Sequence, residues 1–285
     1  FTSFDETPAD LTADHVGNAD VVISNKVLID AAVMQQSKQL RLICVAATGT
    51  NNVDLAAAER LGIRVANVTG YATPSVVQHV FAGLLTLVTR LDRQRQLAMN
   101  GSWATSTQFC VLPESFHELA GMRIGIIGYG ELGRAVADVA SCFGMQVKVA
   151  ARPGGQASEG RVSPQEILRS CDVISLHCPL AENTRNLIDA SALAQMQDHA
   201  ILINTARGGI VDERALAEAL IEGRIGGALV DVLTTEPPVG GNPLLNEKIP
   251  NLVLTPHTAW ASVSARQRLI EGLAANMQAF LSGDT

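Results

Sequence analysis

The sequence has few aromatic residues and no surplus of basic charge. Aromatic side chains make up 4% of the 285 residues, and 21 Lys and Arg stand against 28 Asp and Glu, which gives a formal net charge of −7. An acidic chain is repelled by phosphate backbones and anionic lipid surfaces, and so few aromatic rings leave little for stacking on unpaired bases. We therefore expect neither a nucleic acid nor a membrane as a partner.

Cysteine pairs and long apolar runs are missing as well. The five cysteines are an odd number and show no CxxC spacing, which argues against a disulfide framework and favours a reducing compartment. The longest apolar stretch, residues 76–88, is interrupted by Gln78 and His79 and is shorter than the roughly 20 residues of a membrane-spanning helix. No signal-peptide pattern is present, so we expect a cytoplasmic protein. Because the chain starts at Phe1 and not at Met, we also expect a segment to precede it.

Short β-branched runs alternate with helical stretches along the chain. These runs cover residues 21–24, 40–45, 63–66, 123–127, 146–151, 173–176, 201–204, 228–232 and 252–254. Strands that alternate with helices are typical of the α/β class, in which a parallel sheet carries helices on both faces.

The runs fall into two series, which predicts two domains. A long helical segment at residues 74–99 separates them and is expected to be a linking helix, with Pro74 in its first turn. The last helical stretch can return to the first series. We therefore expect one domain from residues 1–73 and 265–285 and another from residues 100–264.

A β-branched run leads into the glycine pattern GxGxxG and then into a helical pattern. Gly128 allows a tight turn, Gly130 lets the backbone approach a pyrophosphate, and Gly133 lets the helix pack closely on the strand. The first turn of that helix, with Glu131 and Leu132, presents N–H groups and the positive end of the helix dipole to a phosphate. This strand–turn–helix context predicts a dinucleotide site.

The cofactor subtype depends on the end of the next strand. An NAD site places Asp or Glu about 20 residues after the glycine pattern, where it holds the ribose 2′-hydroxyl. Here the strand ends in Ala150 and Ala151, the acid is missing, and Arg152 stands next to the position where it is expected. A guanidinium suits a 2′-phosphate through charge-assisted hydrogen bonds. The sequence therefore favours NADP and leaves NAD open.

Three charged side chains, Arg207, Glu236 and His257, follow three predicted strands of the second series. In an open parallel sheet the carboxyl ends of the strands form the crevice where ligands bind, so we expect these side chains to meet there. A histidine can exchange a hydroxyl proton, a neighbouring carboxylate can orient its ring, and an arginine can bind a substrate carboxylate at two points. Together they predict a hydride-transfer site for an acid substrate.

Longer motifs around these residues resemble the D-isomer-specific 2-hydroxyacid dehydrogenase family. The matching blocks are residues 204–212 (NTARGGIVD), 231–238 (DVLTTEPP), 255–260 (TPHTAW), 176–180 (LHCPL) and 47–54 (ATGTNNVD). They occur in the family's order and cover nearly the whole chain. The resemblance implies an NAD(P)-dependent oxidoreductase of two Rossmann-like parallel-sheet domains, a flavodoxin-like substrate domain and a dinucleotide-binding domain, with a cleft between them.

The resemblance also implies roles for individual residues. Arg207 would bind the 2-keto acid, His257 would act as acid or base, and Glu236 would pair with His257. Backbone N–H groups near Thr48 and Gly49 would hold the substrate carboxylate, beside Arg207 and His257. The cofactor contacts would be Gly128, Gly130, Glu131, Leu132, Gly133, Arg152, His177, Cys178, Pro179, Thr184, Thr205, Ala206, Asp231 and His257, with Asp231 at the nicotinamide carboxamide. A homodimer formed through the cofactor domain is implied as well.

Within the family, residues 70–79 and 260–262 resemble the glycerate dehydrogenase (hydroxypyruvate reductase) branch, which implies reduction of hydroxypyruvate to D-glycerate. The small polar pocket at Ala47 and Thr48 suits a compact, hydroxylated substrate. A glyoxylate or D-lactate type reductase is one alternative. Another is a dinucleotide-sensing corepressor, an interaction protein that resembles this chain in all three catalytic blocks.

The remaining histidines predict no further chemistry. His15, His117 and His199 lack the spacing of metal ligands, so we expect no metal site. His79 has apolar neighbours on its helical segment, and packing or a domain contact is the expected role.

Overall fold

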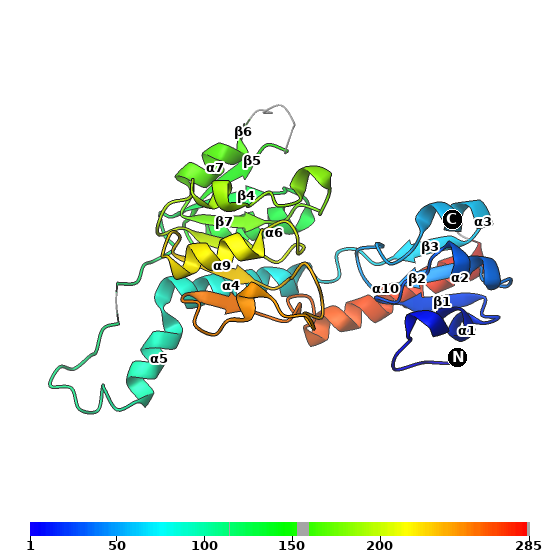
Figure 1. Ribbon diagram of the computed structural model, residues 1–285, viewed down its shortest axis with the longest axis horizontal. Helices are drawn as coiled ribbons and strands as arrows, with labels where there is room; N and C mark the ends of the chain where they lie inside the picture. Colours follow the sequence, from blue (N-terminus) through cyan, green and yellow to red (C-terminus); the bar gives the residue numbers. More distant parts are fainter. Residues whose placement is uncertain (114, 153–159, 284–285) are drawn as a thin grey trace. The chain divides into compact units, whose positions relative to one another are not determined.

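The computed structural model describes residues 1–113, 115–152 and 160–283, and the chain divides into two compact units. Unit 1 comprises Phe1–Ala72 and Ala261–Thr285, and unit 2 comprises Thr73–Trp260. Each unit contains its own parallel sheet with helices around it (Figure 1). The predicted α/β class with two parallel sheets is confirmed.

The sheet of unit 1 has three parallel strands in the order β1-β2-β3. Its elements are η1 (Ala9–Leu11), α1 (Thr12–Val16), β1 (Val21–Ser24), α2 (Ala31–Gln36), β2 (Leu42–Val45), α3 (Leu55–Leu61), β3 (Arg64–Asn67) and α10 (Val263–Ser282). The carboxylates of Asp30 and Asp54 cap α2 and α3 by accepting backbone N–H groups at 2.9 Å. All four residues of β2 are buried, as expected for the central strand of a covered parallel sheet.

The sheet of unit 2 has seven parallel strands in the order β10-β9-β8-β7-β4-β5-β6. Its elements are α4 (Thr73–Thr89), α5 (Leu91–Met99), β4 (Arg123–Ile127), α6 (Glu131–Cys142), β5 (Gln146–Ala150), β6 (Arg161–Val162), α7 (Pro164–Ser170), β7 (Val173–Leu176), η2 (Glu182–Thr184), α8 (Ala190–Leu193), β8 (Ile201–Asn204), α9 (Glu213–Ile221), β9 (Gly227–Val230), η3 (Pro243–Leu245) and β10 (Leu252–Leu254). The chain runs outward from β4 to β6 and then from β7 to β10, so the order reverses between β4 and β7. In such doubly wound sheets, ligands bind at the carboxyl ends of the strands beside this reversal.

Helices cover both faces of this sheet, as β4 illustrates. Gly125 faces Ile167 of α7, whereas the next residue, Ile126, faces Gly133 of α6. Helices α7, α8 and α9 share one hydrophobic cluster with the strands on the first face. Helix α4 lies on the other face, so close that a Cβ on Gly83 would stand 2.6 Å from the side chain of Leu229.

Two details of unit 2 differ from the sequence-based expectation. Residues 74–99, expected to be one linking helix, form α4 and α5, because Arg90 has a left-handed backbone (φ 53°) and interrupts the helix. The Arg90 side chain donates to the Asn251 side chain at this break. Strand β6 has only two residues, too few to give a sequence signal.

A membrane-crossing helix needs both length and apolar character, and no helix in the described part of the chain has the two together.

Candidate active site

The carboxyl ends of four neighbouring strands of unit 2 lie level with one another. The register places Leu176 of β7 opposite Asn204 of β8, and Asn204 opposite Val230 of β9. The residues that follow these strand ends are His177, Thr205, Asp231 and, after β10, Thr255. The strand ends predicted from sequence therefore bring a row of polar side chains to one edge of the sheet.

The glycine turn between β4 and α6 leaves no room for side chains at two of its three glycines. Gly128 has a φ of 96°, and a Cβ there would stand 2.4 Å from the backbone nitrogen of Cys178. A Cβ on Gly133 would stand 2.1 Å from the carbonyl oxygen of Gly128, which explains why the helix can pack so closely. At Gly130, by contrast, a Cβ would meet nothing within 4 Å. The turn is thus closed toward the sheet and open at Gly130, which fits a pyrophosphate bound by backbone N–H groups.

Glu131 and Leu132 form the first turn of α6, with Glu131 exposed and Leu132 half-buried. The carboxylate of Glu131 accepts a 2.5 Å hydrogen bond from the hydroxyl of Thr73 at the start of α4. Contacts of these two residues with a phosphate would therefore come from their backbone, where the first N–H groups of a helix have no intrahelical acceptor.

Two buried polar atoms at this edge, His177 Nδ1 and Thr205 Oγ1, have no hydrogen-bond partner among the described residues. The Nε2 atom of His177 lies 2.8 Å from the hydroxyl of Ser175, and burial lowers the pKa of His177 to about 4, so its ring is neutral near pH 7. Buried polar atoms without partners are costly, and they indicate where a ligand can supply the missing partner. The edge therefore fits a ligand with polar groups, as a dinucleotide has.

The loop after β7 carries the other predicted contacts of this region. Cys178 is buried and Pro179 is exposed. The hydroxyl of Thr184 donates to the carbonyl of Pro179 at 2.7 Å and accepts from the N–H of Ala181 at 2.7 Å. Thr184 thus fixes the backbone of the loop at Pro179 and Ala181. A cofactor contact of this loop would depend on that backbone conformation.

Arg152 follows the end of β5 and is exposed. Nearby in sequence, the guanidinium of Arg161 lies over the ring of Tyr129, 5.8 Å from its centroid. Tyr129 belongs to the glycine turn, so β6 and the turn are joined by this cation–π contact.

Glu236 and His257 are brought together, as the sequence predicts. Glu236 Oε2 lies 2.5 Å from His257 Nδ1, and the other carboxylate oxygen accepts the N–H of Leu233 at 2.8 Å. A carboxylate can only accept, so Nδ1 carries the proton of this hydrogen bond and Nε2 is left for a substrate. The side chains are partly exposed, 33% for Glu236 and 29% for His257, which leaves the pair accessible from solvent.

Arg207 lies on the loop after β8 and is exposed. Its Nη1 donates to the carbonyl of Ala206 at 2.7 Å, and among the described residues no hydrogen bond or ion pair joins it to Glu236 or His257. The next residue holds this loop against the loop after β9, because a Cβ on Gly208 would stand 2.0 Å from the backbone of Leu233. The loops that carry Arg207 and Glu236 are therefore in direct backbone contact.

Asp231 is buried, with 2% of its surface exposed, and organises the loop that carries His257. Its Oδ1 accepts the hydroxyl of Thr255 at 2.6 Å and the N–H of Thr258 at 2.9 Å, and its Oδ2 accepts the N–H of Ala259 at 2.9 Å. Helix α4 reaches the same loop, since His79 Nε2 lies 3.0 Å from Thr255 Oγ1. The sequence suggested only packing or a domain contact for His79, and no local signal pairs it with a residue 176 positions away.

Thr48 and Gly49 lie in unit 1, on the loop that follows β2. The Thr48 hydroxyl donates to the carbonyl of Val68 at 3.2 Å, and its own carbonyl accepts from the Asn67 side chain at 2.6 Å. The loop is thereby tied to the end of β3 within unit 1, and the substrate-binding role of the two residues stays a prediction.

Comparisons with known proteins identify the family of this chain. The family described as D-isomer specific 2-hydroxyacid dehydrogenase, NAD binding domain, matches residues 81–259. The chain is 43% identical over 277 residues to the glycerate dehydrogenase of Methylorubrum extorquens, and the alignment covers 97% of this chain and 87% of the relative. It is 36% identical over 272 residues to the hydroxypyruvate reductase of Blautia hydrogenotrophica, covering 94% and 84%. A solved structure from Thermus thermophilus superposes with a TM-score of 0.87 at 36% identity, covering 98% of this chain and 88% of that one.

The matched residues 81–259 all belong to unit 2, and they include the glycine turn and the Glu236–His257 pair. The family resemblance inferred from sequence is confirmed. The chain belongs to the D-isomer specific 2-hydroxyacid dehydrogenases, enzymes that use a nicotinamide dinucleotide and a small 2-hydroxy or 2-keto acid.

Proposed function

We propose that the enzyme reduces hydroxypyruvate to D-glycerate with a nicotinamide dinucleotide. The observation that carries the chemistry is the pair of Glu236 and His257, 2.5 Å apart at the same sheet edge as the glycine turn. The substrate assignment is supported by the relatives named glycerate dehydrogenase and hydroxypyruvate reductase. It is also supported by residues 70–79 and 260–262, which resemble that branch.

His257 is the proposed acid and base. In the reducing direction its Nε2 donates a proton to the carbonyl oxygen of the 2-keto acid, and in the oxidising direction it takes the proton of the hydroxyl. Glu236 holds Nδ1, so that Nε2 is the ring nitrogen left for the substrate. The dinucleotide, when bound, supplies or accepts the hydride.

Arg207 is the proposed substrate ligand. A guanidinium can hold the carboxylate of a 2-keto acid through two parallel hydrogen bonds and stabilise the negative charge that grows on the neighbouring oxygen. Arg207 is exposed, and among the described residues its side chain donates one hydrogen bond, to Ala206, which leaves most of its donors available to an acid substrate. Thr48 and Gly49 are proposed to bind the same carboxylate through their backbone N–H groups.

The proposed dinucleotide contacts come from three segments of unit 2. Gly128, Gly130, Glu131, Leu132 and Gly133 would hold the pyrophosphate, His177, Cys178, Pro179 and Thr184 would line the loop after β7, and Thr205, Ala206, Asp231 and His257 would lie toward the nicotinamide. Among the described residues, Asp231 Oδ2 accepts only the N–H of Ala259, which leaves it an acceptor position that suits the amide of the nicotinamide. Arg152 favours NADP, because this exposed residue stands next to the position where an NAD site has an acid, and that acid is missing here.

The decisive experiment is steady-state consumption of NADPH and NADH, measured in parallel with hydroxypyruvate, glyoxylate and pyruvate. We expect the highest kcat/KM with hydroxypyruvate and NADPH. A higher value with glyoxylate or pyruvate would replace the substrate assignment by one of the other reductases. Cofactor binding without turnover of any keto acid would favour the corepressor alternative.

The variant Arg152→Ala should lower the preference for NADPH over NADH. An unchanged ratio of the two kcat/KM values would remove Arg152 from its role.

We further infer that the enzyme is a homodimer that pairs through unit 2. Helix α5 and the loop after it extend away from the sheet of that unit (Figure 1). The loop exposes large apolar side chains, with 91% of Phe109 and 74% of Leu112 accessible. Exposed apolar patches of this kind are typical of protein interfaces. Sedimentation of Phe109→Ser with Leu112→Ser should show a shift toward monomer, whereas Val239→Ser, equally exposed on another loop of unit 2, should leave the wild-type state unchanged.

The cytoplasm is the proposed location. All five cysteines are free thiols, and Cys44, Cys171 and Cys178 are buried. Free thiols persist in a reducing compartment.

A further inference from the structure

Helix α4 contacts the loop that carries His257 at two points. The hydroxyl of Ser75 donates to the carbonyl of Ala259 at 2.7 Å, and His79 Nε2 lies 3.0 Å from Thr255 Oγ1. Residues four apart lie on the same face of a helix, one turn from each other. One face of α4 therefore holds both ends of the segment from Thr255 to Ala259, with His257 in its middle.

The hydrogen bonds around Thr255 have a defined direction. The Asp231 carboxylate only accepts, so the 2.6 Å bond between Thr255 Oγ1 and Asp231 Oδ1 uses the single hydroxyl proton of Thr255. The Thr255 oxygen must then accept from His79, which requires a proton on His79 Nε2. The result is a chain of donors that runs from His79 through Thr255 to Asp231.

This chain ends on the group that fixes the backbone around His257. Asp231 accepts the N–H groups of Thr258 and Ala259, and its backbone carbonyl accepts the N–H of His257 at 2.8 Å. His257 itself has a φ of 54°, in the left-handed region that a non-glycine residue adopts only when its surroundings hold it there. The orientation of His257 therefore depends on the hydrogen bonds of Asp231.

We propose that His79 is a positioning residue for the reaction, which acts through Thr255 and Asp231 to hold His257 in its left-handed conformation. This inference rests on the proposed function of His257. The 22% exposed His79 side chain and the 2% exposed Asp231 side chain place the chain of hydrogen bonds inside unit 2, where solvent competes little with it. A histidine that merely filled space would need no proton on Nε2 and no partner at Thr255.

The matched variants are His79→Gln and His79→Asn. The Gln side chain carries its N–H group about as far along as Nε2 of histidine and can still donate to Thr255, whereas the shorter Asn side chain cannot reach. We expect kcat for hydroxypyruvate to fall about tenfold in His79→Asn, the loss of one hydrogen bond, and to return toward wild type in His79→Gln. Gln78→Asn makes the same amide shortening at the neighbouring exposed position of α4 and should match wild type.

Amide hydrogen exchange supplies a readout that needs neither substrate nor cofactor. The N–H groups of Thr258 and Ala259 should exchange about tenfold faster in His79→Asn but not in His79→Gln, while the slowest amides of β4 and β7 stay unchanged. Equal kcat and equal exchange in the Asn and Gln variants would overturn the proposal. Faster exchange at every amide would also overturn it, because it would indicate a loss of global stability instead of a local effect.

A second pair of variants, Thr255→Val and Thr255→Ser, tests the same chain if substitution of His79 prevents folding. Valine removes the hydroxyl with little change of shape, and serine keeps it. Faster exchange at Thr258 and Ala259 in the Val variant alone would support the proposal, and no difference between the two variants would refute it. If wild-type enzyme turns over no keto acid although this exchange pattern is found, the proposed function fails and the positioning of the loop stands.

Discussion

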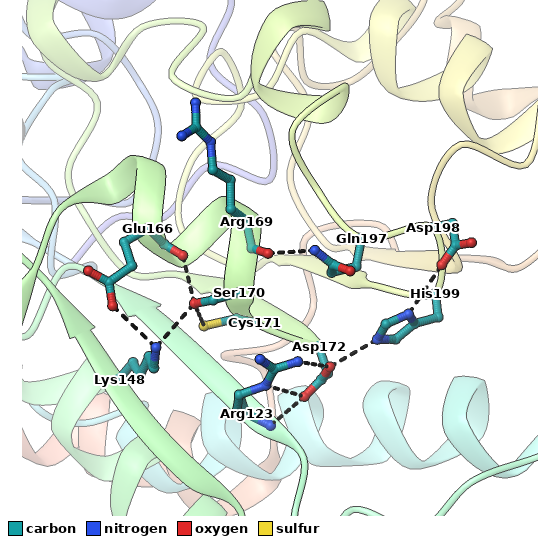
Figure 2. A network of polar contacts seen from close by, with 10 residues as sticks. All are labelled: Arg123, Lys148, Glu166, Arg169, Ser170, Cys171, Asp172, Gln197, Asp198 and His199. Atoms are coloured by element: carbon teal, nitrogen blue, oxygen red, sulfur yellow. Dashed lines mark hydrogen bonds and ion pairs between the residues drawn. The ribbon is translucent and has the colours of Figure 1, made fainter.

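The seven-stranded sheet in unit 2 has an amino edge, where its strands begin, and a carboxyl edge, where they end. Polar side chains are hydrogen-bonded to one another at the first edge and partly without partners at the second. At the amino edge, Asp172 precedes β7 and accepts from Arg123, the first residue of β4, through the backbone N–H at 2.7 Å, Nε at 3.2 Å and Nη2 at 2.9 Å. His199, shortly before β8, lies with its Nε2 2.9 Å from the same carboxylate (Figure 2). These contacts join the starts of three neighbouring strands.

The carboxyl edge has groups that are left without partners. His177 Nδ1 and Thr205 Oγ1 are buried and unpaired among the described residues, and His257 has a left-handed backbone. Local strain and unpaired polar atoms gather at functional sites, where ligand binding can relieve them. The amino edge therefore contributes stability, and the carboxyl edge keeps its polar groups for a ligand.

The same contrast is found in the pKa values. Burial alone would raise the pKa of Asp172, but hydrogen bonds from Arg123 and His199 outweigh it and hold the pKa well below its usual range. The hydrogen bond to Asp172 raises the pKa of His199. At the other edge, burial lowers the pKa of His177 and no charged partner opposes it. The amino edge thus favours the ionised form of Asp172, whereas burial favours the neutral form of His177.

The largest expected effect lies at the carboxyl edge, in His257→Ala. Loss of the acid and base should lower kcat by about a thousandfold and remove the associated step from the pH–rate profile. The measurement is kcat against pH with hydroxypyruvate, and unfolding by urea should remain close to wild type. A profile identical to that of wild type would sink the assignment of His257.

Arg207→Ala should follow, with a loss of kcat/KM for the keto acid of about a hundredfold or more, because the substrate carboxylate loses its two-point partner. The dissociation constant of the dinucleotide, measured by fluorescence titration, should be nearly unchanged. Near-full turnover in this variant would contradict the role of Arg207. Arg169→Ala, at an exposed position in the last turn of α7 just before β7, removes a guanidinium at the amino edge and is a suitable control.

The amino edge should respond in the opposite way to Asp172→Asn. The variant leaves Arg123 and His199 without their carboxylate, so the free energy of unfolding should fall by about 1–3 kcal/mol. Urea unfolding measured by circular dichroism gives this value, and kcat should stay near that of wild type. Asp198→Asn, whose side chain is 91% exposed, should have almost no effect on either quantity. A large loss of kcat with unchanged stability in Asp172→Asn would show that the amino edge serves catalysis and not stability.

The smallest expected effect is the pH dependence that His199 contributes. Because the pKa of His199 is raised in the folded state, its stabilising contribution is complete below the unfolded value of about 6.5 and is lost as pH rises through the folded value. Asp172 stays ionised in this range because its pKa is lowered. The wild type should exceed His199→Gln in unfolding free energy by roughly 0.5 kcal/mol at about pH 5.5, with the difference disappearing near pH 8.5. An equal difference at both pH values would show that His199 acts without its charge.

Sequence reasoning succeeded where a signal is local. The strand that leads into Gly128 and the position of His257 after a β-branched run follow from periodicity and turn glycines alone, because both patterns lie within a few residues. The pairing of Glu236 with His257 followed from the rule that parallel strands end at one edge, together with the family resemblance.

Sequence reasoning failed where a contact joins distant segments. The break at Arg90 has neither glycine nor proline to mark it, and the side chain that meets Arg90 there belongs to Asn251. The contact of His79 with Thr255 spans 176 positions, so an apolar neighbourhood in the sequence suggested packing instead. The network of Asp172 was missed for the same reason, since its members come from three strand starts.

The close approach at Gly208 has a consequence for redesigning the substrate range of this enzyme. No side chain fits between Gly208 and Leu233, so the loops at residues 205–209 and 231–236 are packed backbone against backbone. A shift of one loop is therefore expected to move the other. Lengthening or grafting one loop alone would displace both Arg207, the proposed substrate ligand, and Glu236, the proposed partner of His257. A new acid specificity is therefore more readily introduced by exchanging both segments from a single donor enzyme than by changing either one.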